Sequence, residues 1–120
     1  MAVDLNAWRS VVRQVVMAIS DEKFQRRAWF GVGPEVSSPD EEFCKFFGDA
    51  AIEDFLKRSD NGLNKQQLDA GKHLLTLMRK LSDETPNHIQ PSSLIDDPRW
   101  QEVREAAAQF STLLADGNSR

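Results

Sequence analysis

The chain has 120 residues, 40% of them hydrophobic, which is enough for one core and too few for a second. Its formal net charge of -4 disfavours binding to nucleic acid or to anionic membranes and suits a basic partner. The longest apolar stretch, around residues 15–19, is too short for a membrane span, the N-terminus lacks the order of a secretion signal, and a lone cysteine cannot form an internal disulfide. These features predict one cytoplasmic domain over residues 1–120.

A first helix is predicted from Leu5. Apolar residues recur at steps of three and four, the spacing of one helical face. They are Leu5, Trp8, Val12, Val15 and Ile19. Asp4 is suited to cap this helix, because its carboxylate can accept a hydrogen bond from a free N–H group of the first turn. The stretch 21–27 either extends the helix or forms a second short turn.

The next stretch, Trp29–Phe43, interrupts the helical pattern. Gly31, Gly33 and Pro34 oppose regular structure and indicate a loop. A phosphate-binding loop would follow a strand and precede a Lys-Ser or Lys-Thr pair, and neither is present here. The acids that follow would also repel phosphate. We therefore expect a connection between two helices.

A further helix is predicted to begin at Pro39. Ser38 is a typical N-cap, proline is favoured at the first helical position, and Glu41 stands three residues after the cap. This helix is expected to pause at Gly48 and to restart after Asp49. The side chains expected to be buried in its first part are Phe43, Cys44, Phe46 and Phe47.

Asn64 is expected to cap a long helix over residues 65–81. Leucines and methionines form two stripes along this helix, which indicates a central position in the fold. Gly71 lies on one stripe, where the missing side chain would let a neighbouring helix approach closely.

The last helix is predicted to begin with Asp97 as its cap and Pro98 at the first position. The residues expected in its buried stripe are Trp100, Val103, Ala107, Phe110 and Leu114. A disordered tail is expected from about residue 116. Taken together, the pattern predicts an all-α, single-domain bundle of four to six helices.

The side chains that could carry chemistry do not form a recognisable catalytic or metal-binding pattern. His73 and His88 each have an acid nearby, but no third and fourth ligand is evident, so both are interpreted as surface residues. Cys44 would need a base and an orienting group to act as a nucleophile, and its neighbours are acids that would not activate its thiol. We therefore expect a protein that is not an enzyme and has no cofactor and no metal.

The distribution of charge is uneven. Residues 34–60 contain eight acids and three bases, a net charge of -5, so the rest of the chain is slightly positive. Acids complement the dipole in the first turn of a helix, which accounts for Asp40, Glu41 and Glu42, and for Asp49 if a helix restarts there. About half of the acids are explained in this way.

The other acids, among them Glu53 and Asp54, are predicted to lie beyond a first turn. They could form an ordinary solvated face, or a surface for a basic partner that nearby aromatic residues anchor. The residues predicted to bind such a partner are Trp29, Phe30, Glu35, Asp40, Glu41, Glu42, Asp49, Glu53 and Asp54.

Three short pieces in this region resemble small bacterial immunity proteins of the contact-dependent growth inhibition type. They are WFGVGPEVSSPDE (Trp29–Glu41), FGD (Phe47–Asp49) and DFL (Asp54–Leu56), within about a quarter of the chain. The resemblance implies a small cytoplasmic protein that binds and blocks the toxic C-terminal domain of a related cell's effector, often a nuclease, as a monomer in a 1:1 complex. An acidic face is compatible with this role, because carboxylates can take the place of substrate phosphates in a basic nuclease site.

Other functions remain open at this point. A helical adaptor or regulatory module without a toxin partner would have the same charge pattern. A DNA-binding regulator is disfavoured, because the most basic helices also carry large apolar faces, and no motif supports an undetected enzyme.

Overall fold

The computed structural model describes residues 4–85 and 89–117. Within these ranges it contains helices and no strand, which confirms the predicted all-α bundle. The helices are α1 (Leu5–Ser20), α2 (Glu22–Ala28), α3 (Pro39–Cys44), the π-helical turn η1 (Lys45–Asp49), α4 (Ile52–Lys57), α5 (Lys65–Glu84), the single turn α6 (Pro91–Leu94) and α7 (Pro98–Gly117).

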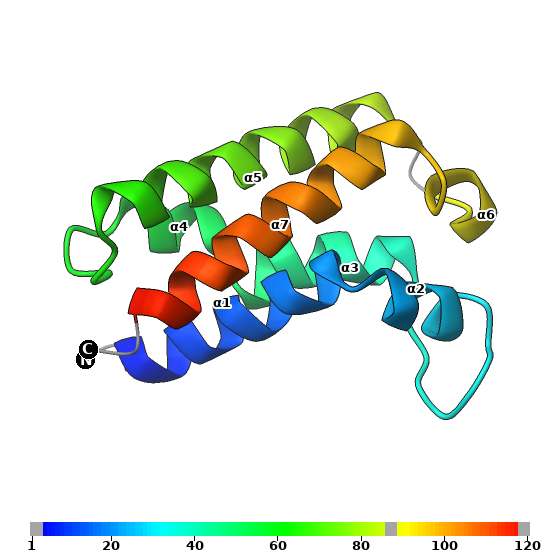
Figure 1. Cartoon of the computed structure of the whole chain (residues 1–120), viewed down its shortest axis with the longest axis horizontal. Coiled ribbons are helices and arrows are strands. Elements are labelled where there is room, and N and C mark those ends of the chain that lie inside the picture. Colours follow the sequence, from blue (N-terminus) through cyan, green and yellow to red (C-terminus); the bar gives the residue numbers. More distant parts are fainter. Residues whose placement is uncertain (1–3, 86–88, 118–120) are drawn as a thin grey trace.

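The bundle is built around α7. This helix lies between α1 and α5 and runs antiparallel to both, while α3, η1 and α4 lie behind them (Figure 1). The prediction that residues 65–81 form the central helix is therefore wrong, since α5 packs mainly on α7 and α4. Two small buried residues of α7, Ala106 and Ala107, leave room for a helix on either side.

The predicted helix starts are confirmed by their capping hydrogen bonds. The Asp4 carboxylate accepts from the backbone N–H of the third residue after it at 3.0 Å, and the Ser38 hydroxyl does the same at 3.1 Å. Asn64 and Gln67 form a reciprocal capping box. Asp97 accepts from the N–H of Arg99 at 2.8 Å. Because Asp21 ends α1 and caps α2, residues 21–27 belong mostly to a separate helix.

The core contains the apolar stripe predicted for the last helix. All five of its residues are buried, and the Trp100 ring has no exposed surface. Gly71 also behaves as expected, because a Cβ atom placed on it would lie 2.8 Å from Cδ2 of Leu56 and 3.0 Å from Cζ of Phe110. A side chain at this position would therefore require Leu56 and Phe110 to move, and glycine lets α5 approach these neighbours closely.

Three details differ from the sequence-based expectations. Cys44 is exposed, not buried, because it follows the buried Phe43 by one residue and so points about 100° away from it around the helix. Phe47 is only partly buried. The helix expected to restart after Asp49 begins instead at Ile52, since Ala51 adopts a left-handed conformation with φ of 44°.

Some predictions fall near or beyond the described residues. His73 is exposed, as predicted, whereas His88 lies outside the described ranges. Helix α7 continues to Gly117, and the remainder of the predicted disordered tail also lies outside them.

Candidate partner-binding surface

The loop between α2 and α3 projects from one end of the bundle (Figure 1). Three of its apolar side chains are exposed, Phe30 by 46%, Val32 by 60% and Val36 by 80%. Gly31 and Gly33 have φ angles of 71° and 96°, which glycine adopts without strain. Exposed apolar side chains gathered on one segment are typical of a surface that contacts another protein.

The two ends of this loop are attached firmly to the bundle. The N–H of Ser37 donates to the carbonyl of Ala28 at 3.1 Å, which closes the loop at its base. Arg27 and Glu35 form an ion pair across it at 3.0 Å. Trp29 is 6% exposed and packs on the Trp100 ring, with centroids 5.6 Å apart. The base is therefore fixed and the apolar tip is presented to solvent.

Of the two aromatic residues predicted to anchor a partner, the structure thus presents only Phe30. Trp29 lies in the core, and its Nε1 is buried without a hydrogen-bond partner among the described residues. Trp29 could therefore affect a partner contact only indirectly, because its packing positions the base of the loop.

Glu42 is a buried carboxylate just after the loop. It has no exposed surface, and one oxygen accepts a hydrogen bond from the Ser37 hydroxyl at 2.7 Å. The other oxygen is buried with no hydrogen-bond partner among residues 4–85 and 89–117. Burial raises the pKa of Glu42, although the Ser37 hydroxyl and the Lys45 charge lower it in part. Glu42 therefore connects α3 to the loop and is not available to a partner.

This buried carboxylate predicts a specific pH dependence. Because the folded-state pKa of Glu42 is raised, its contribution to stability is fully present below the unfolded-state pKa and is lost as the pH rises through the folded-state pKa. Glu42→Gln stays neutral and should escape this loss, so its free energy of unfolding should rise relative to wild type as the pH increases. Urea unfolding at several pH values between about 4 and 7 measures the difference.

Glu102→Gln, at an exposed position on α7, is the control and should leave the wild-type pH profile unchanged. A Glu42→Gln profile parallel to that of wild type over the whole range would contradict the effect assigned to burial.

The remaining predicted acids fall into two groups. Glu35 pairs with Arg27, and Glu53 pairs with Arg79 of α5. The Asp40 carboxylate accepts a hydrogen bond from the N–H of Ile89 at 3.4 Å. These contacts hold parts of the bundle together.

The other group is exposed and consists of Glu41 on α3, Asp49 at the end of η1 and Asp54 on α4. No ion pair involves any of the three within the described part of the chain. They lie on consecutive elements whose apolar side chains face the bundle, so the acids face outward. We call them the outer acids.

The position predicted for Glu53 and Asp54 along their helix is wrong. Because α4 begins at Ile52, both stand in its first turn, where they complement the helix dipole. The sequence cannot show that this helix begins as late as Ile52, because alanine gives no signal for the left-handed conformation of Ala51. Complementarity to helix dipoles therefore explains more of the acidic segment than its sequence suggests.

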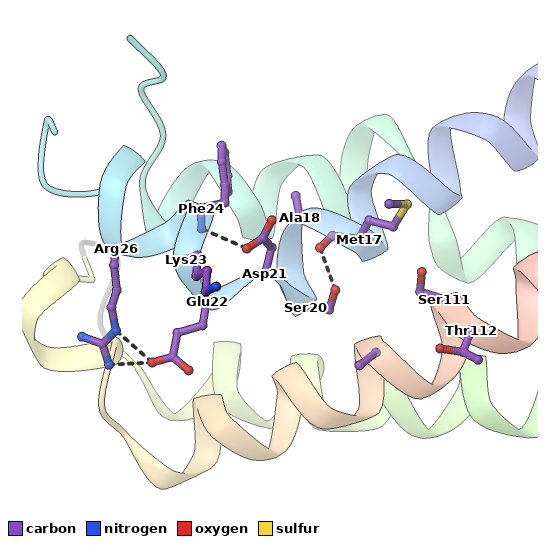
Figure 2. Close-up of a pocket in the computed structure, with 11 residues that line it drawn as sticks. Met17, Ala18, Ser20, Asp21, Glu22, Lys23, Phe24, Arg26, Ser111 and Thr112 are labelled. Carbon is purple, nitrogen blue, oxygen red and sulfur yellow. Dashed lines mark hydrogen bonds and ion pairs between the residues drawn. The ribbon is translucent and has the colours of Figure 1, made fainter. Parts of the chain in front are cut away.

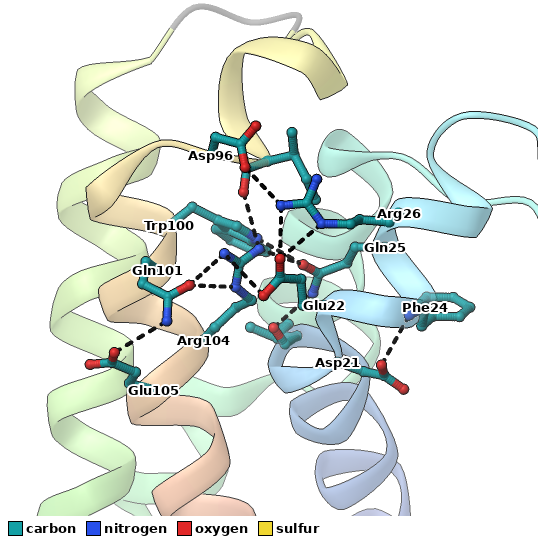
Figure 3. Close-up of polar contacts among 12 residues, drawn as sticks. Asp21, Glu22, Phe24, Gln25, Arg26, Asp96, Trp100, Gln101, Arg104 and Glu105 are labelled. Atoms are coloured by element: carbon teal, nitrogen blue, oxygen red, sulfur yellow. Dashed lines mark hydrogen bonds and ion pairs between the residues drawn. The ribbon is translucent and has the colours of Figure 1, made fainter.

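A buried polar network that sequence reasoning missed holds α2 in place (Figure 3). The Gln25 amide donates to the carbonyls of Ala18 and Ile19 at 2.9 and 2.8 Å, and its oxygen accepts from the Trp100 indole at 2.9 Å. Arg104, 6% exposed, donates to the same oxygen at 3.4 Å.

A sequence signal for this network did exist. Arg104 is one residue from Val103 and three from Ala107, so it stands on the apolar stripe of the last helix. A buried arginine needs polar partners, and here they are side chains of α2 and α7 and the carbonyl of Ile95. The network fixes the end of the bundle from which the α2–α3 loop projects.

A cleft of about 840 Å³ lies between the α1–α2 corner and α7 (Figure 2). Several of its polar groups already have partners within the protein. The Ser20 hydroxyl donates to the Met17 carbonyl, Asp21 caps α2, and Arg26 pairs with Glu22. The described lining thus offers no arrangement of nucleophile, base and orienting group.

Two further observations concern the described residues alone. No group of three or more histidine, cysteine, aspartate or glutamate side chains among them is placed to hold a metal ion. None of the helices in these ranges combines the length and apolar character of a membrane span.

Comparison with models of protein families, with curated proteins and with solved structures finds no match to this chain.

Proposed function

We propose that this protein is a cytoplasmic immunity protein that binds the toxic domain of a bacterial effector and neutralises it. The observation that carries the proposal is the projecting α2–α3 loop, whose apolar tip is exposed while its base is fixed. The resemblance of residues 29–41 to immunity proteins of the contact-dependent growth inhibition type falls on this same loop.

The physical roles of the two parts of the surface differ. Phe30, Val32 and Val36 would supply the apolar centre of the contact, where most of the binding energy of an interface is concentrated. The outer acids would lie toward its rim and would attract a basic partner, which increases the association rate more than the affinity. A nuclease domain is a suitable partner, because its substrate site is basic.

The test is direct binding to a candidate toxin. The probe is the purified C-terminal domain of an effector encoded next to this gene, made with its catalytic residue inactivated, and the measurement is stopped-flow association together with calorimetric affinity. Asp49→Lys with Asp54→Lys should slow association and weaken binding about tenfold or more, and added salt should reduce the difference.

Asp83→Lys with Glu102→Lys is the matched control, since it makes the same charge change at exposed positions on α5 and α7. The control should bind like wild type. If both double variants slow association equally, net charge rather than the outer acids attracts the partner. If the wild-type protein binds no such domain but binds a non-toxic regulatory protein, the adaptor interpretation replaces the immunity proposal.

A further inference from the structure

A groove of about 530 Å³ lies between α4 and α5, and both leucine and basic side chains line it. The leucines are Leu56, Leu63, Leu68 and Leu75. Four basic side chains border it, against a single acid, although the chain as a whole is acidic. The groove is thus a local positive region on a negative protein.

Two of the four basic side chains are already compensated. Arg79 pairs with Glu53, the one acid of the lining, and Arg58 pairs with Asp60 at 2.8 Å. Lys57 and Lys72 are both exposed. Lys57 lies 4.0 Å from Glu53, at the limit of an ion pair, and Lys72 forms no ion pair with any described residue. These two lysines are the charges that a ligand could engage.

The α5 side of the groove is a straight row. Leu68, Lys72, Leu75 and Arg79 follow one another at steps of four, three and four, so they share one face of the helix. Apolar and basic side chains alternate along this face over about 16 Å, or three helical turns. A row of this length and alternation fits an elongated occupant better than a compact small molecule.

We propose that the α4–α5 groove binds an acidic amphipathic helix of a protein partner. Apolar side chains of that helix, spaced three and four residues apart, would lie on the leucines, and its carboxylates would pair with Lys57 and Lys72. Helix α4 and the first turns of α5, which carry the groove residues, lie away from the α2–α3 loop (Figure 1). Helix α4 also carries Asp54, one of the outer acids, but neither Asp54 nor the loop lines the groove. The groove can therefore be tested without reference to the proposed function.

The probe for this proposal is a fluorescein-labelled peptide of about four helical turns, with leucines along one face and glutamates elsewhere. A second peptide has lysine in place of every glutamate. Fluorescence anisotropy with the full-length protein should give saturable binding of the acidic peptide and binding at least about tenfold weaker for the basic one.

The protein variants test the site of binding. Lys57→Glu with Lys72→Glu should weaken the acidic peptide about tenfold or more, and Lys57→Gln with Lys72→Gln should give a smaller loss. Lys23→Glu with Lys80→Glu changes the same charge at other exposed positions and should alter affinity by less than about twofold. Circular dichroism and urea midpoints of all variants should match wild type, because these side chains are exposed.

Three results would overturn the proposal. They are the absence of acidic-peptide binding up to about 1 mM, equal binding of the two peptides, and equal losses in the groove and control variants. Anionic phosphatidylglycerol vesicles form a further arm of the experiment. Binding to vesicles that depends on Lys57 and Lys72, without binding of the acidic peptide, would assign the groove to a lipid surface instead.

Discussion

Trp100→Ala should lower the free energy of unfolding by about 3–5 kcal/mol. The ring is completely buried and packs on Trp29 and Phe43, with centroid distances of 5.6 and 5.9 Å. Its removal would leave a cavity beneath the base of the α2–α3 loop, and the Gln25 oxygen would lose the indole N–H that donates to it at 2.9 Å. Urea unfolding monitored by far-ultraviolet circular dichroism measures the loss.

Two controls separate the cavity from the hydrogen bond. Trp100→Phe keeps most of the ring volume but no N–H group, so it should cost clearly less than the alanine variant. Phe30→Ala removes an exposed ring and should change stability by only about 0.5 kcal/mol. If Trp100→Ala unfolded at the wild-type urea concentration, the ring could not be the buried centre of this core.

The second large effect concerns binding. Replacing Phe30, Val32 and Val36 together by serine should weaken binding to the toxin domain at least about 100-fold, or about 2.8 kcal/mol. The three side chains are the exposed apolar groups of the loop and would form the centre of the interface. Because they contribute little to the core, the urea midpoint of the variant should stay near that of wild type.

Val11→Ser with Met17→Ser is the matched control. These two residues are also exposed apolar side chains, by 36% and 47%, but they lie on α1. The control should bind the toxin domain as wild type does. Equal losses in the loop and control variants would show that general surface hydrophobicity, rather than the loop, determines the affinity.

The helices and most of the core could be predicted because their signals are local. A cap at Asp4, Ser38, Asn64 or Asp97 requires only the side chain and the N–H groups two or three residues later. The buried stripe of the last helix follows from its own spacing. Such features depend little on how the helices pack together.

Several of the wrong or missing predictions concern contacts between distant residues. Glu53 is neutralised by Arg79, 26 residues away, and Gln25 meets Arg104, 79 residues away, so neither pairing has a pattern in the sequence. The central place of α7 depends on which helices flank it, and an apolar stripe does not specify its neighbours.

The candidate surface was therefore only partly predictable. Its location in the stretch 29–54 follows from the loop-forming residues and the acidic charge of that stretch. The burial of Trp29 and Glu42 depends instead on the tertiary packing around Trp100 and Ser37. The exposure of Val32 and Val36 could not be predicted from the sequence, because valine is ordinarily a core residue.

The most direct measurement of the central claim is cell survival during co-expression. The C-terminal domain of a candidate effector, chosen from the genes adjacent to this one, is induced in a sensitive bacterial host. It is expressed together with wild-type protein, the serine variant of the loop, or the Val11 and Met17 control, all at matched soluble levels. Wild type and control should restore colony counts, and the loop variant should not. Death of the cells with all three proteins, or full protection by the loop variant, would contradict neutralisation through the α2–α3 loop.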